Sequence, residues 1–220
     1  MAARLYVVLL GLPGAGKGTQ AAILKDETGL PHVTTGELFR ENIRQSTDLG
    51  KKAQPFVESG RLVPDEITIG MLLDGISQPD CAGGCMLDGF PRNVEQARAL
   101  DEALAAQGKR LDRAIYISVD TDELVRRLSG RWSCPNCGAV YNEISLPPKI
   151  PGVCDNCGSR LEQRKDDRPE AVRTRLEVNL KNLVPLLGYY RAQGKLCEAS
   201  GEGLVEEVTR AVRACLERER

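Results

Sequence analysis

Short apolar runs alternate along the chain with longer stretches in which apolar residues recur at helical spacing. Buried strands are predicted at residues 5–10, 85–87 and 114–119, and amphipathic helices at 18–27, 93–107 and 122–128. A weaker strand at 195–199 precedes a last amphipathic helix at about 204–217. This alternation is typical of a parallel sheet covered by helices, so we predict an α/β fold with three layers.

Two segments interrupt this pattern and are interpreted as insertions. Residues 34–63 are mostly polar with helical spacing and end where Gly60 and Pro64 mark a helix boundary. Residues 130–167 contain four cysteines and two proline-containing turns. Neither segment carries enough apolar residues for a large core. We therefore predict one core, built from residues 1–33, 64–129 and 168–220, with two small inserted domains.

Composition restricts the classes of partner. A chain of 220 residues with 41% hydrophobic content can bury a substantial core, which argues against disorder. Thirty Lys and Arg against 31 Asp and Glu give a net charge of −1, so no global field attracts nucleic acid or an anionic membrane. The apolar run at 5–10 is too short for a signal peptide or a membrane span. We expect a soluble cytoplasmic protein without nucleic-acid or membrane partners.

The cysteines fall into two groups. Two Cys-x-x-Cys-Gly motifs, separated by 16 residues, suit a closed tetrahedral Zn²⁺ site of structural character at Cys134, Cys137, Cys154 and Cys157. Disulfides, or iron or another metal in the same cage of four sulfurs, are the alternatives. The other cysteines show no such pattern, and we expect small buried or partly exposed thiols at Cys81, Cys85, Cys197 and Cys215.

A glycine-rich stretch, GLPGAGKGTQ, follows the first strand and opens a helix, which is the setting that a phosphate-binding loop requires. Glycines let backbone N–H groups turn toward phosphate oxygens, and a lysine adds a mobile charge that follows the transferred group. The alternative is a glycine turn with a surface lysine. The predicted ATP-phosphate ligands are Gly14, Ala15, Gly16, Lys17, Gly18 and Thr19. Gly18 stands where the hydroxyl residue usually follows the lysine, and Thr19 supplies the hydroxyl one residue later.

With Gly18 in that place, GLPGAGKGTQ resembles the opening of the adenylate kinase family of nucleoside monophosphate kinases. The resemblance extends from Leu5 to about Glu207, with motifs in the expected order, and the cysteines match the bacterial type with a zinc-binding lid. It implies a P-loop fold and a monomer that transfers the terminal phosphoryl of ATP to AMP, reversibly and with Mg²⁺, giving two ADP. Residues 34–63 would bind AMP, and residues 130–167 would form the lid.

The acceptor side is carried by two further segments. Asp88 ends an apolar strand, where ligands bind in open α/β sheets, and can organise Mg²⁺ through its water shell; the alternative is a turn-forming role before Gly89. The resemblance places Gln96 on adenine, whose edge a glutamine amide can match, although the residues alone also allow a solvated helix position. The other AMP-binding residues that it implies are Thr35, Arg40, Arg61, Leu62, Val63, Gly89, Phe90, Pro91 and Arg92.

Arginines flank the lid. Taken alone, scattered arginines are usually solvated, but the resemblance places Arg127 on ATP, and Arg131, Arg164 and Arg175 around the transferring phosphoryl. Arg164 and Arg175 also belong to the AMP set. It places Val140, Tyr141 and backbone near Gly203 at the ATP base or ribose, and it marks Asp166 and Asp167 as hinge and lid-closure acids. The sequence departs from the family at Ser145, where an aromatic residue is expected, and at Gly201-Glu202-Gly203, which lacks a frequent lysine.

The expected chemistry needs no general base, because the attacking phosphate oxygen is already ionised near neutral pH. His32, the single histidine, is therefore interpreted as a loop or core residue. Three alternatives remain. The first is a related kinase that uses GTP as donor or UMP or CMP as acceptor. The second is a zinc-ribbon module that binds nucleic acid, and the third is a P-loop regulatory switch.

Overall fold

A five-stranded parallel sheet forms the centre of the molecule. The computed structural model describes residues 5–143, 145–164, 167 and 169–218. The strand order is β2-β3-β1-β4-β7, with β1 in the middle, and the strands are β1 (Tyr6–Leu10), β2 (His32–Thr34), β3 (Cys85–Asp88), β4 (Arg113–Ser118) and β7 (Leu196–Ser200). Every residue of β1 is buried, as its continuous apolar run requires in a sheet covered on both faces.

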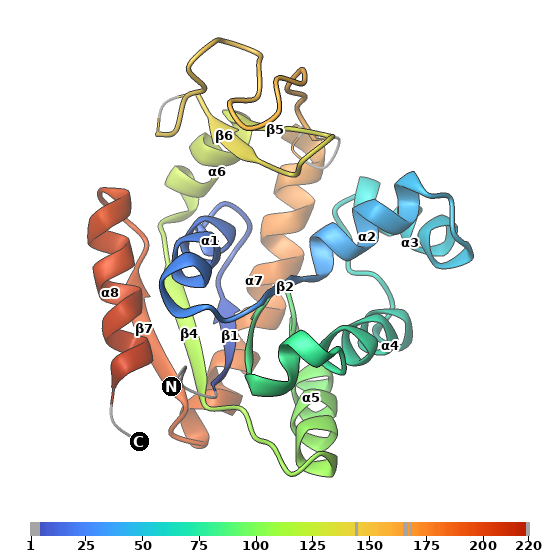
Figure 1. Ribbon diagram of the computed structural model, residues 1–220, viewed down its shortest axis with the longest axis vertical. Helices are drawn as coiled ribbons and strands as arrows, with labels where there is room; N and C mark the ends of the chain where they lie inside the picture. Colours follow the sequence, from blue (N-terminus) through green and yellow to red (C-terminus); the bar gives the residue numbers. More distant parts are fainter. Residues whose placement is uncertain (1–4, 144, 165–166, 168, 219–220) are drawn as a thin grey trace.

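Helices cover both faces of this sheet (Figure 1). On one face α1 packs against α8, and on the other α5 packs against α7, which also contacts α6. Their bounds are α1 (Lys17–Thr28), α5 (Val94–Ala106), α6 (Thr121–Ser129), α7 (Pro169–Ala192) and α8 (Val205–Glu217). The predicted three-layer α/β fold is confirmed. No helix within the described residues is both long enough and apolar enough to cross a bilayer.

A helical unit projects from one side of the sheet (Figure 1). It contains α2 (Thr35–Arg44) and α3 (Asp48–Glu58), and the chain returns through α4 (Asp65–Ile76) and the 3-10 helix η1 (Pro79–Gly83). Phe39, Ala53 and Val63 form its small buried cluster. Helices α2 and α3 approach closely at Gly50, where an added Cβ would lie 2.1 Å from the carbonyl oxygen of Asn42, so this position has no room for a side chain.

The second insertion, the lid, lies above the carboxyl ends of the strands (Figure 1). It contains one short antiparallel pair, β5 (Arg131–Ser133) with β6 (Val140–Asn142), and isolated bridges such as that between Ser133 and Glu162. Its buried cluster consists of Cys134, Tyr141, Cys154 and Leu161. With so few apolar side chains, the lid needs another source of cohesion.

The structure corrects one prediction and adds elements that sequence reasoning missed. Cys197 of β7 and Cys215 of α8 form a disulfide, so the expectation of free thiols is wrong at these positions. The reason is that α8 packs back on β7 and brings their Cα atoms to 5.7 Å, within bonding range. Free thiols are confirmed at the other two positions, Cys81 and Cys85, and both are buried. The missed elements are the strands β2, β5 and β6, the helices α4 and α7, and the 3-10 helix η1.

Candidate active site

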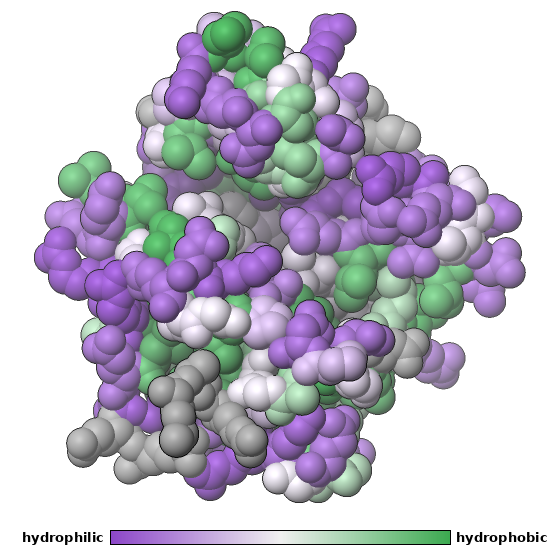
Figure 2. Space-filling view, in the orientation of Figure 1, coloured by the Kyte–Doolittle hydropathy of each residue, from purple (hydrophilic) through white to green (hydrophobic). Residues whose placement is uncertain are grey.

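A cleft of about 790 Å³ lies between the carboxyl ends of the strands, the lid and α2. In the space-filling view it is the hollow beneath the lid at the top (Figure 2). All ten predicted ATP-binding residues line this cleft: Gly14, Ala15, Gly16, Lys17, Gly18, Thr19, Arg127, Val140, Tyr141 and Gly203. The structure therefore brings together residues from the loop between β1 and α1, from the lid and from the segment after β7.

The glycine-rich loop between β1 and α1 wraps around the start of the helix. Gly14 and Gly16 adopt φ angles of 87° and 93°, a left-handed conformation that side chains with a Cβ disfavour. Lys17 Nζ donates hydrogen bonds to the carbonyl oxygens of Gly11, at 2.9 Å, and Leu12, at 3.1 Å. Burial is the main cause that lowers the pKa of Lys17 to about 8, against the opposing attraction of Asp88.

Asp88 ends β3 beside this loop. A Cβ added at Gly18 would lie 3.5 Å from its Oδ2 atom, so the carboxylate lies beside the start of α1. Burial opposes ionisation of Asp88, but the imidazole of His32, the ammonium of Lys17 and the guanidinium of Arg92 hold its pKa below the ordinary value. His32 Nε2 lies 3.5 Å from Asp88 Oδ2, a contact longer than a strong hydrogen bond. Sequence reasoning had given His32 no place at the site.

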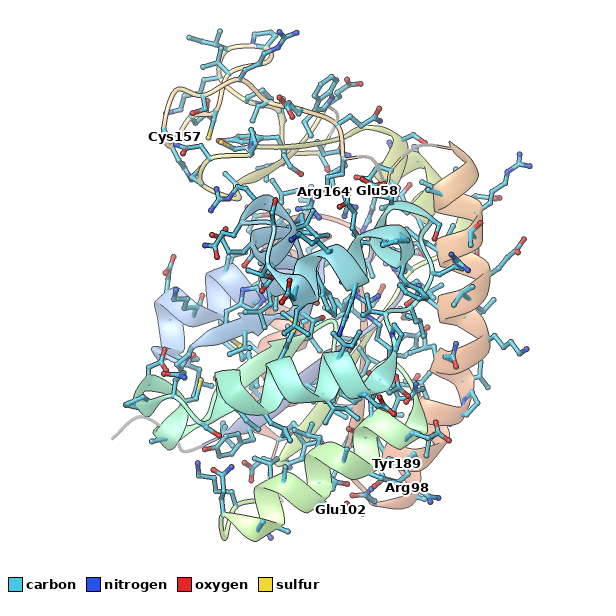
Figure 3. The ribbon with its side chains drawn as sticks, turned by 90° about the vertical axis from the view of Figure 1, so that its right-hand side faces the viewer. Glu58, Arg98, Glu102, Cys157, Arg164 and Tyr189 are labelled. Carbon is cyan, nitrogen blue, oxygen red and sulfur yellow. A yellow bond between two sulfur atoms is a disulfide. The ribbon has the colours of Figure 1, made fainter. Side chains whose placement is uncertain are left out.

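Two of the predicted phosphate arginines share one buried carboxylate. Asp167, whose side chain has no exposed surface, accepts from Arg131 Nε at 2.7 Å and from Arg175 Nη1 at 2.8 Å. A third, Arg164, donates from Nε to Ser133 Oγ at 2.7 Å and lies at the base of the lid (Figure 3). All three arginines line the cleft. Asp166, the other predicted lid acid, lies outside the described residues.

Arg127 connects α6, the helix that leads into the lid, to the loop after β7. It donates from Nε to Glu123 Oε1 at 2.7 Å and from Nη2 to the carbonyl oxygen of Gly201 at 3.0 Å. Hydrogen bonds from Arg126 and then Arg127 hold the pKa of Glu123 at about 2, so this carboxylate stays ionised. An added Cβ at Gly201 would lie 2.6 Å from a methyl group of Ile117, which explains why this close approach requires glycine.

The side chain of Tyr141 is directed into the lid. It is 6% exposed, its hydroxyl accepts from the backbone N–H of Asp155 at 2.8 Å, and it lies 3.5 Å from Cys154 Sγ. Tyr141 nevertheless borders the cleft, as Ser145 does. Its contact with the donor base stays a prediction.

A second, smaller pocket of about 70 Å³ lies between α2, the turn before α4 and the start of α5. The predicted AMP-binding residues that line it are Arg40, Arg61, Leu62, Val63, Arg92, Gln96 and Arg175. Gly89, Pro91 and Arg164 border the larger cleft instead. Thr35 and Phe90 line neither: Thr35 Oγ1 donates to the carbonyl oxygen of Gly89 at 3.0 Å, and Phe90 is buried in the main core.

The four cysteines of the lid motifs come together as predicted. Their sulfur atoms all lie within 4.8 Å of one another, with Cys134 and Cys157 at 3.4 Å and Cys137 and Cys154 at 3.5 Å. Cys157 lies at the left side of the lid in Figure 3. Sulfur ligands of a tetrahedral zinc ion are about 3.8 Å apart, so this donor set fits a zinc ion and is not paired into disulfides.

Comparisons with known proteins identify the family of the chain. A family model described as adenylate kinase matches residues 9–195. The adenylate kinase of Streptomyces avermitilis is 52% identical over 98% of this chain and 98% of its own length, and that of Streptomyces griseus is 53% identical over 93% and 94%. The adenylate kinase of Methanocella arvoryzae is 47% identical over 96% of this chain and 98% of its own length. Because these matches span nearly the whole chain, the chain belongs to the adenylate kinase family.

Proposed function

We propose that this protein catalyses the reversible, Mg²⁺-dependent transfer of the terminal phosphoryl of ATP to AMP, giving two ADP. The observation that carries the proposal is that the two cavities share residues. Arg40, Arg92 and Arg175 line both the large cleft behind the phosphate loop and the small pocket beside α4. The phosphates of a donor nucleotide in the cleft and of an acceptor nucleotide in the pocket would therefore meet at the same cations.

The chemical problem in this reaction is charge, because two polyanions must approach in line. In the proposal, the backbone of the glycine-rich loop and Lys17 bind the donor phosphates. Arg131, Arg164 and Arg175 surround the phosphoryl group during its transfer, and Arg92 binds the acceptor phosphate. These groups are already placed, by contacts such as those of Arg131 and Arg175 with Asp167, and such preorganised charge is where most of the rate enhancement of many enzymes arises.

Mg²⁺ would be held by Asp88 through water, with Thr19 nearby on the phosphate loop. When bound, the ion neutralises charge on the donor phosphates. Ionisation of Asp88 supports this role, because its pKa is held below the ordinary value by the cations around it. No base is assigned, since the attacking oxygen belongs to an ionised phosphate.

The two insertions are proposed to close over the nucleotides and exclude water, which would otherwise accept the phosphoryl. Residues 34–63 would close over AMP and residues 130–167 over ATP, with zinc at the four lid cysteines as a structural ion. Action as a monomer in the cytoplasm is part of the same proposal. Size-exclusion chromatography with light scattering checks the first of these two points.

A coupled assay across four acceptors, AMP, GMP, CMP and UMP, with ATP or GTP as donor tests the proposal. We expect ATP with AMP to give by far the largest kcat/KM. If CMP or UMP surpasses AMP, the acceptor assignment is wrong. If GTP surpasses ATP, the donor assignment is wrong.

A further inference from the structure

The small pocket is bordered by a buried glutamine whose amide is fixed from two sides. Gln96 is 1% exposed, and its Oε1 atom accepts from the backbone N–H of Arg92 at 2.8 Å. Its Nε2 atom donates to Asp65 Oδ1 at 2.6 Å. A carboxylate can only accept and a backbone N–H can only donate, so these two neighbours agree on which end of the amide is oxygen and which is nitrogen.

Asp65 is itself held in place. It is the first residue of α4, which packs against α5, and Asn93 Nδ2 donates to its two oxygens at 3.0 and 3.2 Å. Asn93 Oδ1 in turn accepts from the backbone N–H of Gln96 at 2.8 Å, as the cap of α5. The carboxylate, the cap and the amide thus form one connected network behind the pocket, and sequence reasoning assigned no role to Asp65 or Asn93.

The direction of this amide matters for a purine. After these two bonds, an amide has one N–H and one oxygen lone pair left to offer. Adenine presents an amino donor beside a ring-nitrogen acceptor, whereas guanine and hypoxanthine present a carbonyl acceptor beside an N–H donor. An amide in one orientation matches the first pattern and must rotate by 180° to match the second. Here rotation would set Oε1 against the carboxylate of Asp65 and the NH₂ group against the N–H of Arg92.

We propose that Asp65 is a specificity-determining positioning residue, which selects adenine over 6-oxopurines in the acceptor monophosphate by preventing rotation of the Gln96 amide. The inference rests on the proposed function, in that Gln96 reads the acceptor base. Asp65 does not touch the nucleotide. Its effect is exerted through Gln96, because a site whose polar groups are fixed rejects a ligand that leaves them unpaired.

The variant Asp65→Asn tests this proposal, because it keeps the shape but can both donate and accept, so residue 65 no longer opposes rotation of the Gln96 amide. The backbone N–H of Arg92 then holds Oε1 alone. We expect the ratio of kcat/KM for AMP to that for GMP or IMP to fall roughly 10- to 100-fold, mainly through KM for AMP. The KM for ATP should stay unchanged. Glu66→Gln, which removes an exposed charge from the same turn of α4, is the matched control and should keep the wild-type ratio.

The outcomes distinguish a failure of the proposed function from a failure of the positioning role of Asp65. Wild-type enzyme that does not prefer AMP would contradict the proposed function itself. An Asp65→Asn enzyme that discriminates as the wild type does, or that loses AMP and GMP use in parallel, would overturn the positioning role. Asp65→Ser, which also removes the carboxylate, replaces the first variant if that one does not fold, and the same change in ratio is expected. Asp65→Glu should retain more discrimination than Asp65→Asn, since it keeps an acceptor that faces Nε2.

Discussion

Lys17 is bound to its own loop: its Nζ atom donates to the carbonyl oxygen of Gly11 at 2.9 Å. Lys17 is half-buried at the edge of the cleft, and the charges of Arg92, Arg131 and Arg175 all disfavour its positive charge and lower its pKa. An incoming phosphate would replace the carbonyl contacts with stronger, charge-assisted hydrogen bonds. The strain of placing these cations together is therefore expected to be relieved when the nucleotide binds.

Replacing Lys17 by Met should abolish most activity without unfolding the protein. The charge that follows the phosphoryl group is lost, whereas a Met side chain of similar length fills the same half-buried space. We expect kcat to fall by about 100-fold or more, with an unchanged circular dichroism spectrum. Lys25→Met, an exposed position on the same helix, serves as control. Near-normal turnover in the Lys17→Met variant would remove the phosphate-loop assignment.

The pKa of Lys17 predicts a pH dependence. Burial lowers it to about 8, so the lysine is charged below that pH and loses its proton above it. The value of kcat/KM for ATP, which reports the free enzyme, should therefore decline above about pH 8. Bound phosphates favour the charged lysine, so kcat should hold to higher pH. A profile of kcat/KM that stays level to pH 9.5 would disagree with this account.

Arg92→Ala should damage the use of AMP more than the use of ATP. Arg92 lines the small pocket, and its Nε atom donates to the carbonyl oxygen of Gly89 at 2.8 Å, which directs the guanidinium toward the place where the two cavities meet. Loss of one charge-assisted phosphate contact should raise KM for AMP at least 10-fold. Steady-state kinetics with each substrate varied in turn measure this change.

The control for that variant is Arg98→Ala, an exposed residue of α5, the helix that begins shortly after Arg92, at the end of the molecule opposite the lid (Figure 3). It should leave both KM values unchanged. If Arg92→Ala changes only the affinity for ATP, the assignment of the acceptor side is incorrect.

Removal of the lid metal should affect stability more than chemistry. The four cysteine sulfurs form a closed set, and among the described residues the other side chains of the lid core are Tyr141 and Leu161, with Trp132 and Ala139 partly buried against them. We expect chelation to lower Tm by at least about 5 °C, the equivalent of roughly 2 kcal/mol for a chain of this size. Turnover at low temperature should change less than threefold.

Cys157→Ser provides the control for chelation, because an enzyme that already lacks a ligand should show little further change in Tm. A metal-free enzyme with unchanged melting but no activity would show that the ion has a catalytic role.

Much of the fold follows from local pattern, and the strands and helices predicted from it lie within two residues of those observed. The long α7 was missed because Pro185 and Gly188 interrupt its sequence and apolar Leu180 and Val184 face solvent, so no clean amphipathic stripe appears. The strand β2 has three residues, too few to show a period.

Relationships between distant residues could not be predicted from the pattern. Cys197 and Cys215 lie 18 residues apart on different elements, and only the packing of α8 on β7 brings them together. Asp65 and Gln96 lie 31 residues apart and meet because α4 packs on α5. By contrast, the phosphate loop and the lid cysteines are short motifs, and their spacing alone predicted that the loop residues would line one cleft and that the four sulfurs would gather.

The most direct test of the central claim uses ADP as the only nucleotide. Phosphorus NMR of the enzyme with ADP and Mg²⁺ should show ATP and AMP appearing in equal amounts until equilibrium, with no release of inorganic phosphate. This result requires both cavities to bind nucleotide and the phosphoryl to pass between them in a closed site. ADP that remains unchanged, or that yields AMP and inorganic phosphate, would contradict the account.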